Sequence, residues 1–207
     1  GASKPGPYFQ FHHKLTITIS SSTFSKKPTK DVYCIVSYCE GGFKGKRKPY
    51  IRAKYTNKLV STANSFASKR CEKSIVFNDQ FTIELPPTIA ENTYITFEFM
   101  SLSFKKHKQE LIGISVMPIM INGGFIKDGK KKLAIFDSLD TLNESEWKAT
   151  SNQNKHVICT HLFSSLVSTD SQLNELFEGK NVDLSNSDPN ELLRNIFQVV
   201  DVLTNRI

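Results

Sequence analysis

The sequence predicts an all-β protein, an antiparallel β-sandwich of about eight short strands that is followed by C-terminal helices. Two observations predict the sandwich: apolar and polar residues alternate along several short stretches of residues 1–136, and turn-forming residues separate these stretches. A third predicts the helices. From residue 169 onward the apolar residues recur at the helical spacing of about 3.6 residues instead of alternating.

The expected strands follow one another along the chain. Lys14–Ser20 alternates strictly, as a half-buried strand does, and Asp31–Cys39 is rich in β-branched and aromatic residues, which indicates a strand buried on both faces. Pro86 and Pro87 end a later strand because proline cannot donate to a sheet ladder. The other expected strands are Tyr50–Leu59, Ser74–Phe77, Gln80–Leu85, Thr93–Met100, Leu111–Met117 and Lys132–Phe136.

Two helices are expected after the strands. Thr169–Glu178 begins with a capping-box pattern and stops at Gly179, and a second helix opens at Asp188-Pro189. The second helix carries a wide apolar stripe that needs a partner. We expect residues 1–7 to be a disordered cloning remnant, residues 8–165 to form the sandwich, and residues 166–207 to be a linker with the start of a helical scaffold.

Composition narrows the class of protein further. A chain of 207 residues suits one mid-sized domain, and no apolar run approaches the roughly 20 residues of a membrane span. The cysteines Cys34, Cys39, Cys71 and Cys159 form no CxxC pair, and no secretory signal is evident. We therefore expect a reduced intracellular chain without structural zinc.

Positive charge is concentrated in the first part of the chain, although the net charge is only +7. Residues 1–74 hold 15 Lys and Arg against 3 Asp and Glu, residues 75–136 hold 7 against 6, and residues 137–207 hold 5 against 11. This distribution favours an anionic partner for the first part: nucleic acid, an anionic membrane or an acidic protein.

The segment LIGISVMPIMINGGFIKDGKKKLAIF, Leu111–Phe136, resembles the late strands of a known module. That module is the membrane-binding C2 domain of DOCK-family guanine nucleotide exchange factors, called DOCK homology region one. Tyr94–Ser101 is similar to the aromatic strand that comes before it in the family. His161–Ser165 and Ser168–Leu173 resemble the linker that follows the domain, and the last helix resembles the start of the family's helical scaffold.

The resemblance implies a C2-type sandwich with three loops at one end that meet a membrane. By strand order these are Ser21–Lys30, a second loop around Phe77–Gln80, and Met100–Ile112. Calcium takes about 6–8 oxygen ligands, mostly carboxylates. The first loop has no acid before Asp31 and the third has only Glu110, so we expect no calcium site.

The first and third loops are rich in lysine instead. If they are neighbours, their ammonium groups surround one concavity, which suits a polyphosphorylated inositol headgroup. Aromatic side chains at the loop tips would anchor the domain at headgroup level. The resemblance implies a 3-phosphorylated phosphoinositide, with the trisphosphate favoured. The expected lipid-binding residues are Lys26, Lys27, Lys30, Lys105, Lys106, His107 and Lys108, with Phe24 and Phe104 at the tips.

A second basic stretch allows two interpretations. It is either a secondary patch for phosphatidylserine or nucleic acid, with Tyr50 and Tyr55 as stacking residues, or a solvated hairpin, which we slightly favour. Its residues are Lys44, Lys46, Arg47, Lys48, Arg52 and Lys54. The lysines around Asp128-Gly129 are interpreted as a polar turn.

No pattern in the sequence indicates catalysis or a cofactor. His12-His13 has no second cluster at metal-ligand spacing, and GxSxG, P-loop and HExxH patterns are missing. We expect no enzyme activity, no cofactor and no metal. The resemblance implies a cytoplasmic, peripheral membrane module that targets a Rac/Cdc42-type exchange factor.

The expected partners follow from this interpretation. They are an anionic phosphoinositide and the remaining domains of the parent protein, whereas a small GTPase would be met only indirectly, through another domain. Nucleic acid is a weaker alternative, which would use the basic stretch 44–54. A protein-interaction module, with the last helix as the docking element, is another.

Overall fold

The structure, a computed structural model, describes residues 12–25, 28, 31–71, 73–103, 108–142, 146–150 and 154–164, with only the backbone for Arg70, Cys71 and Leu139. Lys14–Phe163 form one compact unit. The helices expected after residue 165 and the segment 1–7 lie outside the described residues. In the part of the chain that is described, no helix has the length and apolar character needed to cross a membrane.

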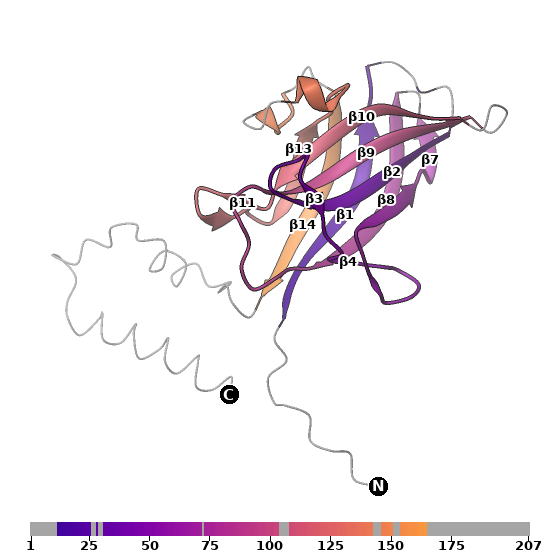
Figure 1. Cartoon of the computed structure of the whole chain (residues 1–207). Coiled ribbons are helices and arrows are strands. Elements are labelled where there is room, and N and C mark those ends of the chain that lie inside the picture. The colour runs from indigo at the N-terminus through magenta and orange to yellow at the C-terminus, as the bar shows by residue number, and fades with distance from the viewer. Residues whose placement is uncertain are drawn as a thin grey trace, which may run out of the picture. The chain divides into compact units, whose positions relative to one another are not determined.

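Two large antiparallel sheets dominate the described residues and pack face to face (Figure 1). The first has seven strands, in the order β13 (Gly129–Ala134), β14 (Lys155–Ser164), β1 (His13–Thr23), β8 (Ser74–Glu84), β4 (Ile51–Arg52) and β5 (Leu59–Val60), with β7 (Lys69–Cys71) also paired to β8. The second has five, in the order β10 (Lys108–Pro118), β9 (Thr93–Ser103), β2 (Asp31–Glu40) and β3 (Lys46–Arg47), with β6 (Thr62–Phe66) also paired to β2. The expected β-sandwich is confirmed.

Alternating side chains of both sheets fill the space between them. Ile17 of β1, Val36 of β2 and Phe97 of β9 have no exposed surface and belong to one continuous core. Hydrogen bonds also connect β10, at the edge of the second sheet, with the end of β13 in the first sheet and the residues after it. Ser115 donates to the Ala134 carbonyl at 2.7 Å, and Ile114 and Phe136 exchange two backbone hydrogen bonds at 2.8 Å. A hairpin of β11 (Met120–Ile121) and β12 (Gly124–Phe125) and a short 3₁₀ helix, Leu139–Thr141, complete the described elements.

The expected strand Tyr50–Leu59 is wrong. Only Ile51–Arg52 and Leu59–Val60 pair as strands, and a turn separates them. The Ala53 N–H donates to the Lys58 carbonyl at 2.8 Å, and Asn57 adopts a φ of 55°. Asparagine tolerates this left-handed conformation better than most residues, so the turn depends on a local backbone preference that the apolar pattern did not show.

The two expected strands Ser74–Phe77 and Gln80–Leu85 are one continuous strand, β8. Its pairing with β1 shifts register between Ile19 and Ser21, and Asn78 in the same region has a φ of 54°. A β-bulge thus replaces the expected loop, since one extra residue in a strand bends it without ending it. The loop expected around Phe77–Gln80 is wrong for this reason.

Strand β14 was not expected, although it pairs with β13 along its first half. His161–Ser164, which resemble a linker, are its last residues. The strand alternates buried and more exposed side chains, with His156, Ile158 and Thr160 buried. Two of these three residues are polar, so the sequence does not show the alternation of apolar and polar residues that predicts a strand.

His156 lies fully buried in the core. Its Nδ1 lies 2.8 Å from the Ser22 hydroxyl, and its ring is 4.8 Å from Phe97 and 5.0 Å from Phe99 between ring centroids. Burial among aromatic rings lowers the pKa of His156 from 6.5 to about 3, against a smaller opposing effect of a hydrogen bond with the Ser21 backbone. The folded protein therefore holds a neutral imidazole at neutral pH.

Acidification should destabilise the fold through His156. Below pH 6.5 the unfolded chain binds a proton at this residue and the folded chain does not, so the stabilisation present above pH 6.5 is lost as the pH falls toward 3. We expect a loss of about 1.4 kcal/mol per pH unit in this window from His156 alone. Urea denaturation at several pH values would measure it. His156→Gln should flatten the profile, and parallel profiles for the two proteins would contradict the assignment.

Candidate functional site

The strand ends that flank three connections lie at one end of the sandwich. These connections are the β1–β2 connection, the β7–β8 turn and the β9–β10 hairpin. The register places Thr23, at the end of β1, opposite Ser74, at the start of β8, and their hydroxyl oxygens are 3.0 Å apart. Asp31, at the start of β2, pairs with Leu102, next to the base of the β9–β10 hairpin. The first connection is therefore tied to the second at its start and to the third at its end.

The first and third expected lipid loops are shorter in the structure than the sequence predicted. Strand β1 continues to Thr23, and Ser103 pairs with Lys108, so the β9–β10 connection spans residues 104–107. Lys26, Lys27, Lys30, Phe104, Lys105, Lys106 and His107 lie outside the described residues. The flanking residues Asp31 and Lys108 start strands that are two positions apart in the sheet, a separation of roughly 10 Å.

Phe24 does not stand at an exposed loop tip, and this expectation is wrong. The side chain is only 6 % exposed, and its ring meets Phe99 edge-on at 5.4 Å and 86°. A Cβ added at Gly113 would lie 3.5 Å from the Phe24 ring and 2.5 Å from Ile135, so glycine at this position leaves room for both side chains. An aromatic ring at the edge of a β-sandwich gains more from core burial than from solvent exposure.

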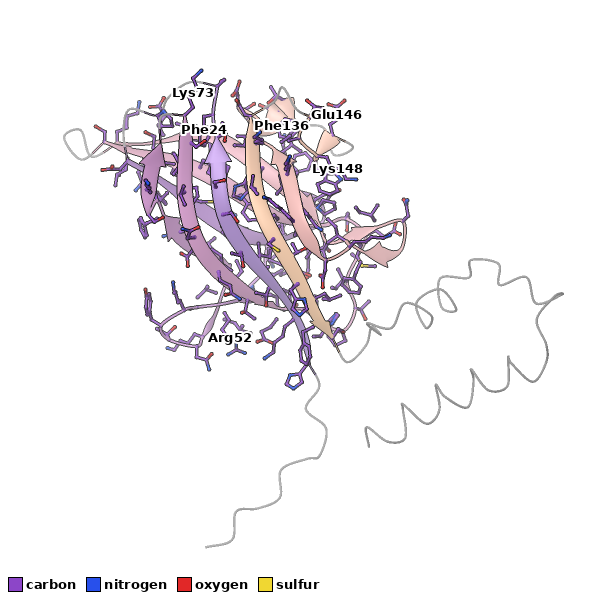
Figure 2. All side chains as sticks on the ribbon, turned by 180° about the vertical axis from the view of Figure 1, so that it is seen from behind. Phe24, Arg52, Lys73, Phe136, Glu146 and Lys148 are labelled. Atoms are coloured by element: carbon purple, nitrogen blue, oxygen red, sulfur yellow. The ribbon has the colours of Figure 1, made fainter. Side chains whose placement is uncertain are left out.

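The Phe24 backbone adds a further tie, because its N–H donates to the Lys73 carbonyl at 3.0 Å. Phe24 thus holds the start of the β1–β2 connection against the β7–β8 turn and against β10. Figure 2 shows Phe24 and Lys73 at the same end of the sandwich, whereas Arg52 lies at the opposite end. We assign Phe24 the role of a positioning residue for this end.

Lys69 and Lys73 are cations at this end that the sequence analysis missed. Both are exposed, Lys69 at the start of β7 and Lys73 in the turn between β7 and β8. The β7–β8 turn takes the place of the second loop that was expected around Phe77–Gln80. The charged pair Glu72-Lys73, which lies between two short strand-like stretches, could have indicated this turn. It was overlooked because the strand was expected to break after Phe77 instead.

The basic stretch 44–54 lies at the other end and is largely neutralised by carboxylates. It follows the end of β2, whereas the three connections above lie at the start of β2. Most of its members form ion pairs: Lys44 with Asp140 at 3.0 Å, Arg47 with Glu98 at 2.6 Å, Lys48 with Glu40 at 3.1 Å, Arg52 with Glu84 at 2.7 Å, and Lys54 with Asp79 at 2.9 Å. A paired cation has less charge to offer a phosphate, so the solvated-hairpin interpretation fits this stretch better.

The Asp128-Gly129 turn is held by local polar contacts. Asp128 accepts a hydrogen bond from the Leu162 N–H at 2.8 Å and lies 3.1 Å from His161 Nδ1. Lys131 donates to the Lys127 carbonyl, and desolvation lowers the pKa of Lys131. These contacts hold the bend at Asp128, but Lys130, Lys131 and Lys132 lie in β13 and not in the expected polar turn, because they pair with β14.

Chemistry-bearing residues are dispersed in the described part of the chain. No group of three or more His, Cys, Asp or Glu that could hold a metal ion occurs there. Cys34 is buried in the core, as expected, and burial raises the pKa of its thiol well above the usual range. His13 lies 2.7 Å from the Ser164 hydroxyl through Nδ1, a structural contact within the ends of β1 and β14.

Phe24→Ala should cost the domain about 3–5 kcal/mol of unfolding free energy, since it removes a buried aromatic ring from a packed site. Phe163→Ala is the matched control, because Phe163 is 54 % exposed, and we expect a change of less than about 1 kcal/mol there. Chemical denaturation monitored by circular dichroism would measure both. An unchanged stability of Phe24→Ala would restore the exposed-tip interpretation.

Comparison with known families supports the β-sandwich fold. The profile of the family "C2 domain in Dock180 and Zizimin proteins" matches residues 8–172, most of the chain. No curated protein matches the chain. The match covers every described strand of the sandwich and the three connections at the Phe24 end. We call this end the basic end, because it carries exposed Lys69 and Lys73 and the sequences of the first and third connections are rich in lysine. This chain belongs to the family of C2 domains found in Dock180 and Zizimin proteins.

Proposed function

We propose that the domain is a calcium-independent phosphoinositide-binding module that recruits a DOCK-type guanine nucleotide exchange factor to the cytoplasmic face of membranes. The observation that carries the proposal is that the strand ends flanking three connections lie at one end, and two of these connections hold the lysine-rich stretches of the sequence. Their shared end would gather Lys26, Lys27 and Lys30 with Lys105, Lys106 and Lys108 around one anionic headgroup.

The chemistry of these residues favours a phosphate ligand. Ammonium groups are strong point-charge donors to phosphate oxygens, and several of them match the several phosphates of one inositol ring. Each lysine near an anionic membrane surface contributes about 1 kcal/mol, so the binding should be appreciable and should weaken with salt. Lys69 and Lys73 extend the same positive surface to the β7–β8 turn.

The ligand class we favour is a 3-phosphorylated phosphoinositide, with the trisphosphate first. In this proposal the domain performs no chemistry. Nucleotide exchange on a Rac/Cdc42-type GTPase belongs to another part of the parent protein, which the membrane-bound domain holds near its substrate. The C2 family is a non-catalytic module, which supports this division of labour.

Charge reversal at the third connection should abolish most of the binding. For Lys105→Glu with Lys106→Glu and Lys108→Glu, we expect a loss of at least about 3 kcal/mol, which is about a hundredfold in affinity. Co-sedimentation of the full chain with phosphatidylcholine vesicles, with and without a 3-phosphorylated phosphoinositide, would measure it.

The chain offers a matched control at the opposite end of the sandwich. Lys44→Glu with Lys46→Glu and Lys48→Glu makes the same change in net charge with nearly the same spacing. It should retain most of the phosphoinositide-dependent binding. An equal loss in both variants would mean that net charge alone drives the binding, and intact binding of the first variant would refute the assignment of the site.

A further inference from the structure

An apolar row crosses the five-stranded sheet near its basic end. The register places Phe66 of β6 opposite Tyr33 of β2. Tyr33 in turn lies opposite Met100 of β9, which lies opposite Leu111 of β10. Four neighbouring strands therefore contribute one apolar side chain each, and we call these four residues the apolar row. Strands lie about 4.8 Å apart, so the row is roughly 14 Å long.

The apolar row lies on the face of the sheet that points away from the core. Cys34 follows Tyr33 in β2 and pairs with Phe99, and both of these residues are fully buried in the core between the sheets. Successive side chains of a strand point to opposite faces. Tyr33 and Met100, next to them in sequence, therefore face outward, and so do their partners in the row.

The two ends of the row are accessible, and its middle is fixed. Phe66 is 67 % exposed and Leu111 is 39 % exposed. The Phe66 ring stacks on Tyr33, with 5.7 Å between ring centroids and 29° between ring planes. The Tyr33 hydroxyl donates to Gln109 Oε1 at 3.0 Å, which holds this ring across β9. The row is therefore ordered before any partner binds, so a partner does not have to order it.

The apolar row lies close to the basic end, a few residues along the strands toward the middle of the sandwich. Tyr33 comes two residues after the start of β2 and Met100 three residues before the end of β9. At about 3.3 Å per residue, the row is roughly 7–10 Å from the strand ends. Glu98, the next outward residue of β9, is compensated by Arg47 at 2.6 Å. Exposed Lys69 follows Phe66 by three residues.

We propose that the apolar row enters the interfacial region of an anionic bilayer while the basic end holds the headgroups. This inference rests on the proposed function and adds the orientation of the docked domain. The row faces outward beside the basic end and not beyond it, so the docked domain is tilted, with this outer face of the sheet against the bilayer. The bilayer interface accepts apolar side chains next to cations. Phe24, one of the two expected anchors, is buried in the core, and the row adds apolar contact at this end.

The test compares vesicle binding with binding of the free headgroup by the full chain. The vesicles contain phosphatidylcholine, phosphatidylserine and a 3-phosphorylated phosphoinositide, and the soluble probe is inositol tetrakisphosphate. Phe66→Ala with Leu111→Ala should weaken vesicle binding about tenfold by removing apolar contact, while affinity for the soluble probe stays unchanged. The matched control is Tyr55→Ala with Leu59→Ala, another exposed aromatic–leucine pair, beside Arg52 at the opposite end, which should leave both affinities unchanged.

A direct readout of insertion uses tryptophan at the same positions. Brominated acyl chains should quench the fluorescence of Phe66→Trp on vesicles and leave Tyr55→Trp unquenched, and the single native tryptophan, Trp147, is buried and gives the background. Unchanged vesicle affinity of the double variant, or an absence of quenching at residue 66, would overturn the inference. The proposed headgroup binding would stand in that case, and the row would be a surface for a protein partner. A wild-type chain that binds neither probe would overturn the proposed function as well.

Discussion

The packing of Phe24 is the constraint on which the basic end depends. The residue belongs to the lysine-rich connection after β1, yet its ring lies in the core against Phe99 and Gly113. Its N–H is bonded to the Lys73 carbonyl. One residue therefore ties the start of the β1–β2 connection to the β7–β8 turn through its backbone and to β9 and β10 through its ring, because a buried aromatic ring has a single well-packed position. In the proposed site, lysines on connections that are tied in this way would lose less freedom on binding an anion than lysines on independent loops.

Ion pairs engage most of the positive charge at one end of the described sandwich. At the end that carries the stretch 44–54, lysines and arginines meet carboxylates of β2, β8 and β9 and of the segment around Asp140. These pairs brace short strands and are worth little individually, but they reduce the field that an approaching anion meets. The lysines of the other end stand next to few acids in the sequence, since Asp31, Glu72 and Glu110 are the nearest. Charge density along the sequence favours the stretch 44–54, the end at which most cations are paired.

The sandwich and most of its long strands could be predicted because alternation is a strong local signal. β2, β9 and β10 follow the expected ranges, and the resemblance identified the family. What could not be predicted depended on single backbone positions or on distant partners. Asn78 looked like a turn and is part of a bulge, because only the pairing with β1 shows that the strand continues. β14 was missed because its inward-facing residues His156 and Thr160 are polar, and their burial depends on partners in the folded core. Phe24 looked exposed for the same reason.

The central claim is that the three connections at the Phe24 end form one anion-binding surface. Backbone amide chemical shifts, followed while inositol tetrakisphosphate is titrated into the full chain, test it most directly. The account predicts shifts at Ser25, Asp31, Lys73, Ser103 and Lys108 that saturate together with one affinity, and undisturbed amides from Lys44 to Lys54. Shifts confined to the stretch 44–54, or separate affinities for the three connections, would contradict it.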